Sequence, residues 1–423
     1  MEAILQVLGG RRKVVRMRLA IIFVLALASV VVAQNPAQQS DTIDKMGGRG
    51  TSLVADKDGN LHVSYTTDDG QVKYAFRPAG AARWFVLTIA TTSSVTERDS
   101  GGVFTRIAVD ANGNPYICYT NPGVQYANYA GGRWQTQQLM NSVGVSRYAC
   151  GIAISPNGTP HVSWYQERDA ATGQFDLHLK YAVLTQGTWR LKTLDYDTAT
   201  GKWNQLVVDE KGFPHIAYSA FVSGHAKYAF WDGKDWHIEG VEAPLHKTEG
   251  LGMGDAIVID SKGQPRISYY DEHSLKYAYK SGDKWIQEKV DTISPRGLAF
   301  EDYRSSIALD SKGMPYICYE NAGSLKLAYF DGKKWNKQII APAGSEEYLF
   351  SSIAIGPNDV VYVAYRDTAA GSLVLFTMPR PAAGAAAEAT AKPTAKPAAK
   401  PGIPSIANTS QEEIKNNAAE HAR

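Results

Sequence analysis

The sequence predicts an all-β fold, a seven-bladed β-propeller built from four-stranded antiparallel blades. One pattern of residues occurs seven times between Thr51 and Pro381, and its clearest copies begin at Ala256 and Ser306. The copies lie about 50 residues apart, a period typical of propellers and solenoids. Each copy contains four short runs with strand character, and the segments between them show no helical periodicity. A single four-stranded sheet cannot bury two apolar faces, so we expect the sheets to stack around a ring.

The four runs follow one another in a fixed order. The first is apolar and β-branched and ends in an Asp-x-x-Gly turn. A Pro such as Pro265 opens the second run, and the third reads Leu-Lys-Tyr-Ala-Tyr at residues 275–279. A Gly-containing turn then leads to a Trp that begins the fourth run. We expect these Trp side chains to be wedges between blades: Trp84, Trp134, Trp189, Trp236, Trp285 and Trp335.

The seventh copy is incomplete, because it stops near Pro379 without a Trp-containing fourth run. Residues 41–44, ahead of the first copy, resemble the ends of fourth runs such as residues 289–292. We therefore predict that this N-terminal segment completes the last blade and closes the ring.

The segment before the ring has the features of a signal peptide, which we assign to residues 1–33. Basic residues precede an apolar run of about 15 residues, which is short for a membrane helix. An uncleaved signal anchor is the alternative. Residues 34–381 form the predicted propeller, and we expect a secreted, periplasmic or cell-surface protein.

The segment after the ring changes composition. Residues 382–408 are rich in Ala, Lys and Pro, which predicts an extended spacer. Residues 409–423 form a short tail that is compatible with a helix, with Ser410 as the N-cap and Glu413 three residues later. Two interpretations stay open: simple disorder, or a tether that attaches the propeller to an anionic cell envelope.

The composition excludes some classes of protein. The formal net charge is +2 over 423 residues, and no aromatic-basic motif for nucleic acid occurs. The sequence shows no zinc-type Cys/His spacing, phosphate loop or nucleophile elbow, so we expect no metal and no cofactor. Cys118 and Cys318 share one repeat position that holds Ser or Ala elsewhere, as small buried residues do. Whether Cys118 is bridged to Cys150 stays open.

The predicted binding face carries the loops that join each fourth run to the next blade. These loops are long and differ between blades, whereas the turns between third and fourth runs are short and alike, and variable loops carry function. Polar and aromatic residues near these loops could stack on sugar rings and hold an anionic group; alternatively, they make local hydrogen bonds. The candidates are Arg106, Arg147, Tyr148, Tyr165, Trp203, Tyr270, Asp271, Tyr303, Arg304, Glu320, Tyr348 and Arg366.

The Tyr-Ala-x-x-x-Gly-x-x-Trp turns at residues 228–236 and 277–285 resemble those of the sialidase-like propellers with Asp-box (BNR) repeats. The resemblance covers about 330 residues. It implies propeller blades of this type and, in the enzymatic form of the family, three Arg that hold a substrate carboxylate, a Tyr–Glu nucleophile pair and an Asp acid/base. The matching candidates are Arg106, Arg147, Arg304 and Arg366, with Tyr303 or Tyr348, Glu320 and Asp271.

We therefore expect a non-catalytic propeller that binds a glycan or a surface protein on the long-loop face. The alternative is a sialidase-like glycoside hydrolase. A third interpretation is a structural component of the cell envelope, attached through the C-terminal tail.

Overall fold

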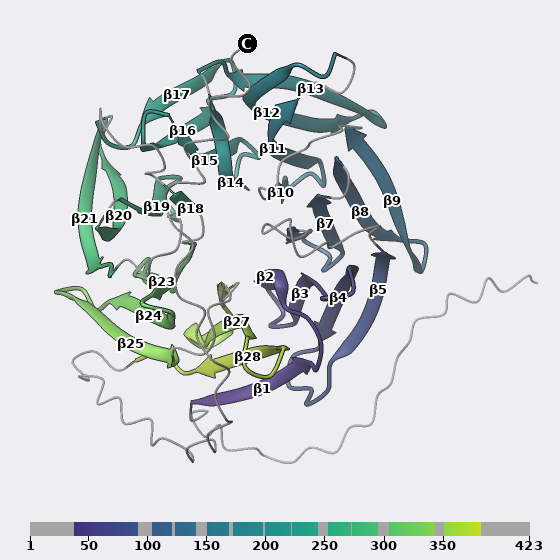
Figure 1. Cartoon of the computed structure of the whole chain (residues 1–423), viewed down its shortest axis with the longest axis vertical. Helices are drawn as coiled ribbons and strands as arrows, with labels where there is room; N and C mark the ends of the chain where they lie inside the picture. The colour runs from purple at the N-terminus through teal and green to yellow at the C-terminus, as the bar shows by residue number, and fades with distance from the viewer. Residues whose placement is uncertain are drawn as a thin grey trace, which may run out of the picture.

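The computed structural model describes residues 38–91, 104–120, 123–140, 150–168, 172–197, 199–220, 222–243, 253–271, 273–294, 304–342 and 351–381. These residues form seven four-stranded antiparallel sheets arranged in a ring (Figure 1). The predicted fold class is therefore confirmed. The predicted signal peptide, spacer and tail lie outside the described residues. No helix in the described ranges is long and apolar enough to cross a membrane.

The first strand of each blade lies at the ring centre, and the following strands lie progressively further out. We call this first strand the inner strand and number the blades in the order of their inner strands along the chain. Blade 1 contains β2 (Arg49–Ala55), β3 (Leu61–Thr66), β4 (Gln71–Arg77) and β5 (Phe85–Thr91). Blade 2 contains β6 (Thr105–Val109), β7 (Pro115–Thr120), β8 (Val124–Ala130) and β9 (Arg133–Met140). Blade 3 contains β10 (Gly151–Ile154), β11 (Pro160–Arg168), β12 (Phe175–Thr185) and β13 (Thr188–Asp195).

The second half of the ring repeats this order. Blade 4 contains β14 (Thr200–Val208), β15 (Pro214–Ala220), β16 (His225–Trp231) and β17 (Trp236–Gly240). Blade 5 contains β18 (Met253–Ile259), β19 (Pro265–Tyr270), β20 (Ser274–Ser281) and β21 (Lys284–Thr292). Blade 6 contains β22 (Ser305–Leu309), β23 (Pro315–Asn321), β24 (Ser324–Phe330) and β25 (Trp335–Ala341).

Blade 7 joins the two ends of the ring. Its first three strands, from the ring centre outward, are β26 (Ser351–Ile355), β27 (Val361–Asp367) and β28 (Ser372–Met378). A 3-10 turn (Pro357–Asp359) links β26 and β27. Its outer strand is β1 (Gln39–Asp44), which pairs antiparallel with β28 (Figure 1). The N-terminal segment therefore completes the last blade, as the repeat pattern predicts.

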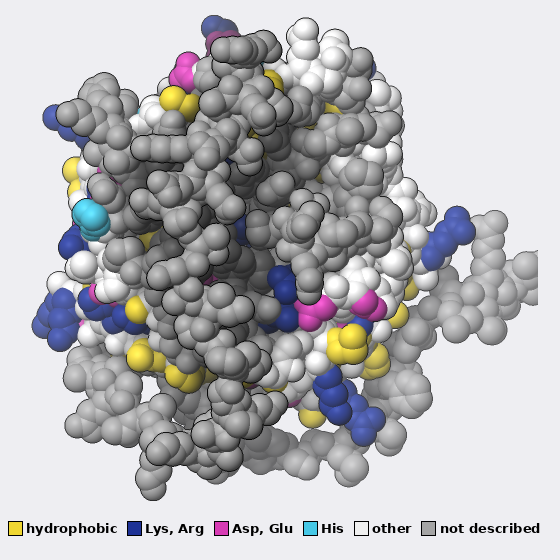
Figure 2. Space-filling model, viewed as in Figure 1, with side chains coloured by type: hydrophobic (Ala, Val, Ile, Leu, Met, Phe, Trp, Pro, Cys, Tyr) yellow, Lys and Arg dark blue, Asp and Glu magenta, His cyan; other side chains and the backbone are white. Residues whose placement is uncertain are grey.

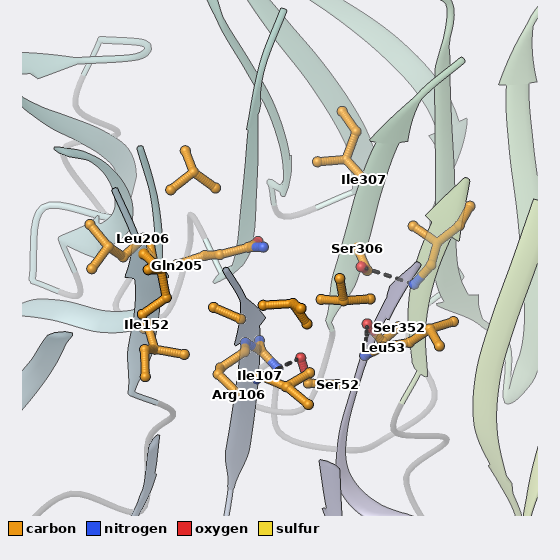
Figure 3. A pocket seen from close by; sticks show the side chains of 18 of the residues that line it. Ser52, Leu53, Arg106, Ile107, Ile152, Gln205, Leu206, Ser306, Ile307 and Ser352 are labelled. Atoms are coloured by element: carbon orange, nitrogen blue, oxygen red, sulfur yellow. Dashed lines mark hydrogen bonds between the residues drawn. The ribbon is translucent and has the colours of Figure 1, made fainter. Parts of the chain in front are cut away.

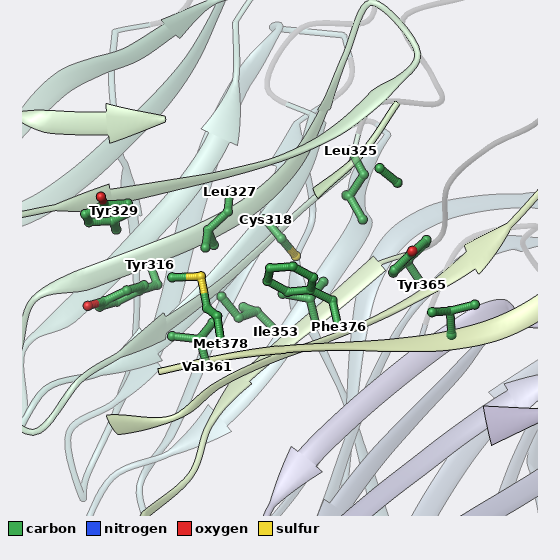
Figure 4. Close-up of a cluster of buried hydrophobic side chains, with 13 residues drawn as sticks. Tyr316, Cys318, Leu325, Leu327, Tyr329, Ile353, Val361, Tyr365, Phe376 and Met378 are labelled. Carbon is green, nitrogen blue, oxygen red and sulfur yellow. The ribbon is translucent and has the colours of Figure 1, made fainter. Parts of the chain in front are cut away.

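Apolar side chains fill the spaces between neighbouring blades. Figure 4 shows one such cluster, where Leu325 and Leu327 of blade 6 face Val361, Phe376 and Met378 of blade 7. All five are buried. The alternating strands place these residues on the faces that adjoin the next blade, and apolar burial is the main favourable term in folding.

The repeated Trp side chains lie between blades, but they are half-buried rather than fully buried. Trp285 illustrates the arrangement: its ring packs edge-on against Tyr228 of blade 4 at 5.5 Å between centroids. Its indole N–H also donates to Glu239 of blade 4 at 2.9 Å. The predicted wedge position is therefore confirmed. Each Trp keeps an open edge because it begins an outermost strand, where no further strand covers it.

An ionic network recurs at four of the blade interfaces. At each, a carboxylate from the outer part of one blade accepts hydrogen bonds from a Tyr hydroxyl and a Lys ammonium of the next blade. In one example, Asp291 accepts from Tyr319 at 2.8 Å and lies 3.4 Å from Lys326. The four sets are Tyr65–Asp44–Lys73, Tyr218–Asp195–Lys227, Tyr269–Glu242–Lys276 and Tyr319–Asp291–Lys326.

Replacing Asp291 by Asn will lower the free energy of unfolding in a pH-dependent way. Burial raises the pKa of Asp291, but hydrogen bonds from Lys337, Tyr319 and Asn321 outweigh it and lower that pKa to about 2. A carboxyl group that ionises more readily when folded stabilises the fold above its unfolded pKa, near 3.8. We expect a loss of about 2 kcal/mol at pH 7, which shrinks as the pH falls from about 4 to about 2.

Urea unfolding at pH 7, 4 and 2.5 measures this difference. Asp283→Asn is the matched control, because Asp283 is an exposed residue of the same blade. A constant difference between Asp291→Asn and the wild type across this pH range would contradict the prediction.

Candidate functional site

The inner strands enclose an axial channel with a cavity of about 300 Å³. Figure 3 shows its lining, which comes from the inner strands of every blade except blade 5. Most lining side chains are small or apolar, such as Ser52, Leu53 and Ile107. Among the described residues, Arg106 of β6 is the one charged side chain in this lining. Of the predicted binding residues that the structure describes, it alone lines the channel.

Four of the twelve predicted binding residues lie outside the described residues: Arg147, Tyr148, Tyr303 and Tyr348. The other eight are described, and they lie in several blades. Seen down the ring axis, Lys and Arg side chains lie next to Asp and Glu side chains on the described part of the face in view (Figure 2). Ion pairs engage at least two of the predicted charged residues, Arg366 and Asp271.

Arg366 is the clearest case of a charge engaged in the fold. Its side chain is buried and forms a two-pronged ion pair with Asp68, with both N–O distances at 2.9 Å. It also donates to the backbone carbonyl of Gly47 at 3.1 Å. The guanidinium thus connects blade 7 to blade 1 and to the closing segment. Asp271 is likewise paired, with Lys276 at 2.9 Å.

Tyr270, Arg304 and Glu320 meet between blades 5 and 6. The buried Tyr270 hydroxyl donates to the backbone carbonyl of Arg304 at 3.0 Å and accepts from the backbone N–H of Glu320 at 3.1 Å. The Arg304 guanidinium lies 4.0 Å above the ring centre of Phe104, a buried residue of blade 2. Phe104 and Arg304 each directly precede an inner strand, so this cation–π contact spans one end of the axial channel.

Tyr165 and Trp203 form a separate group at the interface of blades 3 and 4. Both are buried, and the Lys202 ammonium lies 5.7 Å from the centre of each ring. The binding role of these residues stays a prediction.

The three predicted arginines that the structure describes lie in different surroundings. Arg106 lines the channel, Arg304 covers Phe104, and Arg366 pairs with Asp68. The predicted arginines within the described residues therefore do not form the three-arginine set that the sialidase resemblance implies, and Arg147 lies outside the described residues.

A larger cavity, of about 620 Å³, lies between blades 3 and 4. Its lining includes the β10–β11 turn, the β14–β15 turn, residues 190–192 of β13 and the first residue of β17. We call it the interblade pocket. Turns between first and second strands share a face with turns between third and fourth strands, so this pocket opens opposite to the predicted long-loop face.

Aromatic rings form one wall of the interblade pocket. Trp236 packs edge-on against Tyr181 of blade 3, with 4.9 Å between ring centroids. Trp231 lies 6.1 Å from Trp236, and Phe213 lies over the backbone of Gly233, where an added Cβ would come within 2.8 Å of the Phe213 ring. The half-buried Phe213 and Trp231 leave apolar ring surface facing the cavity.

Positive charge surrounds the same pocket. The described side chains of Arg190, Lys192 and Lys211 line it, are exposed, and have no ion-pair partner within the described ranges. The described lining contains no Asp or Glu. His161 at its base is neutral at pH 7, because burial lowers its pKa to about 4. The pocket therefore combines aromatic surface with three cations.

The sequence contains a signal for this pocket. Phe213 occupies the repeat position held by Gln264 in blade 5, and Trp231 occupies the position of Leu184 in blade 3 and Lys280 in blade 5. A position whose residue differs from blade to blade is not needed to build the structure that all blades share. The asymmetry of loop lengths directed our prediction to the opposite face, so these two residues were missed.

In the described residues, no group of three or more His, Cys, Asp or Glu side chains is placed to hold a metal ion.

Comparison with known proteins leaves the family open. No protein-family model matches the sequence, and no curated protein matches it. The resemblance to sialidase-like propellers therefore stays a prediction.

Several solved structures are similar in shape. A lectin of Aleuria aurantia, described as a six-bladed β-propeller with a novel fucose recognition mode, is 17% identical and has a TM-score of 0.47 over 73% of this chain and 100% of its own. AofleA of Arthrobotrys oligospora is 13% identical, with a TM-score of 0.47 over 73% of this chain and 91% of its own. A Dyadobacter fermentans protein of unknown function is 12% identical, with a TM-score of 0.44 over 80% and 99%. These likenesses are too distant to assign a ligand.

Proposed function

We propose that this protein is a non-catalytic carbohydrate-binding propeller that takes an acidic saccharide in the interblade pocket. One observation supports this: the ring faces of Phe213 and Trp231 lie beside Arg190, Lys192 and Lys211, which have no ion-pair partner among the described residues. Aromatic faces attract the apolar C–H surface of sugars, while guanidinium and ammonium groups bind carboxylate or sulfate. The cavity volume of about 620 Å³ suits a ligand of one or two sugar rings.

We further propose that the protein acts outside the cytoplasm, on a glycan of a cell surface. The predicted signal peptide supports export, and so does the disulfide between Cys118 and Cys150, since such bonds persist in oxidising compartments. Attachment to the envelope through residues 382–423 remains part of this proposal. A surface protein is the alternative partner, recognised through its glycan.

Glycan-array screening of the mature chain, followed by calorimetry, tests the proposal. Phe213→Gln and Trp231→Leu install the residues of blades 5 and 3 at these positions, and we expect each to weaken binding at least tenfold, about 1.4 kcal/mol. Phe330→Leu, the position of Trp231 in blade 6, is the control and should bind normally.

Two results would contradict the proposal. Unchanged affinity in both pocket variants would place the sugar elsewhere on the ring. Release of free sugar from a bound glycan would show hydrolysis and favour the glycosidase alternative.

A further inference from the structure

One repeat position lines the axial channel in every blade except blade 5. It is the residue before the central apolar residue of each inner strand, and its occupants are Ser52, Arg106, Gly151, Gln205, Ala256, Ser306 and Ser352. In four blades this side chain accepts a hydrogen bond from the next blade's inner strand. Figure 3 shows two of these bonds, from the Ile107 N–H to Ser52 and from the Leu53 N–H to Ser352. The shared role of the position is therefore to join neighbouring blades.

Arg106 departs from this role. A guanidinium carries only donors, so it cannot accept a hydrogen bond from Ile152 of blade 3. Its side chain makes no hydrogen bond and no ion pair with any described residue, and Nε is fully buried. The side chain is enclosed by protein atoms on the channel wall and keeps part of its surface open to the cavity.

The described residues around Arg106 offer no counter-charge in the channel lining. The described lining of the channel contains no Asp or Glu. Burial alone lowers the pKa of Arg106 to about 10, so the group stays positively charged at neutral pH. A buried charge without a partner is strongly unfavourable, which makes an unpaired guanidinium costly to keep in an empty channel.

The channel wall provides further donors. Ser52, Ser306 and Ser352 accept backbone N–H groups through their hydroxyl oxygens, which leaves each hydroxyl hydrogen able to donate. Gln205 accepts the Ile257 N–H through Oε1, which leaves its amide N–H₂ facing the cavity. Arg304 adds a second positive charge at the channel end, above Phe104. The serine and Gln205 donors and the Arg106 guanidinium line one space of about 300 Å³.

We infer that the axial channel binds a small oxyanion (a carboxylate, phosphate or sulfate) through the guanidinium of Arg106. A planar guanidinium can donate two parallel hydrogen bonds to two oxygens of such an anion. The serine hydroxyls and the Gln205 amide can donate to the remaining oxygens of the anion. This site is separate from the interblade pocket, and the inference holds whether or not that pocket binds sugar.

Thermal unfolding of the mature chain in a zwitterionic buffer, titrated with acetate, phosphate, sulfate or chloride at matched ionic strength, tests this inference. We expect at least one oxyanion to raise the melting temperature with saturation, and chloride to have a smaller effect. The oxyanion with the lowest half-saturation concentration identifies the class. Isothermal titration of the same anion gives its Kd directly.

Arg106→Gln is the decisive variant, because Gln205 shows that Gln fits this position and accepts the next blade's N–H. We expect it to weaken oxyanion binding at least tenfold while it melts no lower than the wild type in anion-free buffer. Arg133→Gln, at an exposed position of blade 2, should keep the full response. If Arg106→Gln does not fold, Arg106→Lys replaces it and should bind more weakly because ammonium lacks the fork.

Three results would overturn the inference: no saturable response in the wild type, an equal response to chloride and oxyanions, or a full response in the Arg106 variant.

Discussion

Removing residues 38–46 will lower the melting temperature by roughly 10 °C or more, the largest change that we expect from any variant described above. The deletion removes β1 and leaves the edge of β28 unpaired. It removes Ile43, which is buried against Leu53 and Leu375, and a truncated Ile alone costs about 2–5 kcal/mol. It also removes Asp44, which accepts from Tyr65 at 2.6 Å and from Lys73 at 3.0 Å.

A point substitution separates strand pairing from side-chain packing. Ile43→Ser should reproduce part of the loss, whereas Thr42→Ser, at the exposed neighbouring position, should melt as the wild type does. The unpaired edge of β28 also predicts aggregation of the deletion variant, which light scattering detects. A deletion variant that melts at the wild-type temperature would show that the ring does not need this strand.

The fold could be predicted because its signals are local and repeated. Apolar inner strands, Asp-x-x-Gly turns and outer Trp residues recur within each blade, and the closing strand is recognisable as a displaced fourth run. The burial of Trp285 was harder to predict, since it depends on what covers the outermost strand.

The site could be predicted only in part, because its contacts join distant residues. Arg366 and Asp68 are 298 positions apart in the sequence, and no local sequence pattern predicts that they form a pair. Arg106 was singled out as a residue that differs between blades, but its orientation along the channel wall depends on the closed ring. Phe213 and Trp231 also differ between blades, but they lie on the opposite face of the ring.

The disulfide between Cys118 and Cys150 occupies a place where other interfaces use hydrogen bonds. Cys118 belongs to β7 of blade 2, and Cys150 directly precedes β10 of blade 3. At the equivalent positions, Ser64 bonds Thr105 at 2.7 Å, and Ser268 bonds Ser305 at 2.9 Å. The disulfide therefore joins blades 2 and 3 at the position where a hydrogen bond between side chains joins blades 1 and 2 and blades 5 and 6.

Replacing both cysteines by Ser should therefore preserve the fold and lower the free energy of unfolding by about 3 kcal/mol. The cross-link closes a loop with a sequence separation of 32, and a loop of that size restricts the unfolded chain by about 3–4 kcal/mol. A Ser–Ser hydrogen bond like that of Ser268 and Ser305 would restore about 0.5–1 kcal/mol. Guanidinium unfolding of Cys118→Ser/Cys150→Ser measures the difference, with Cys318→Ser as the control for loss of a buried thiol. Because the cost arises in the unfolded chain, reduced wild type should unfold like the double variant, and identical curves for the oxidised and reduced protein would contradict the prediction.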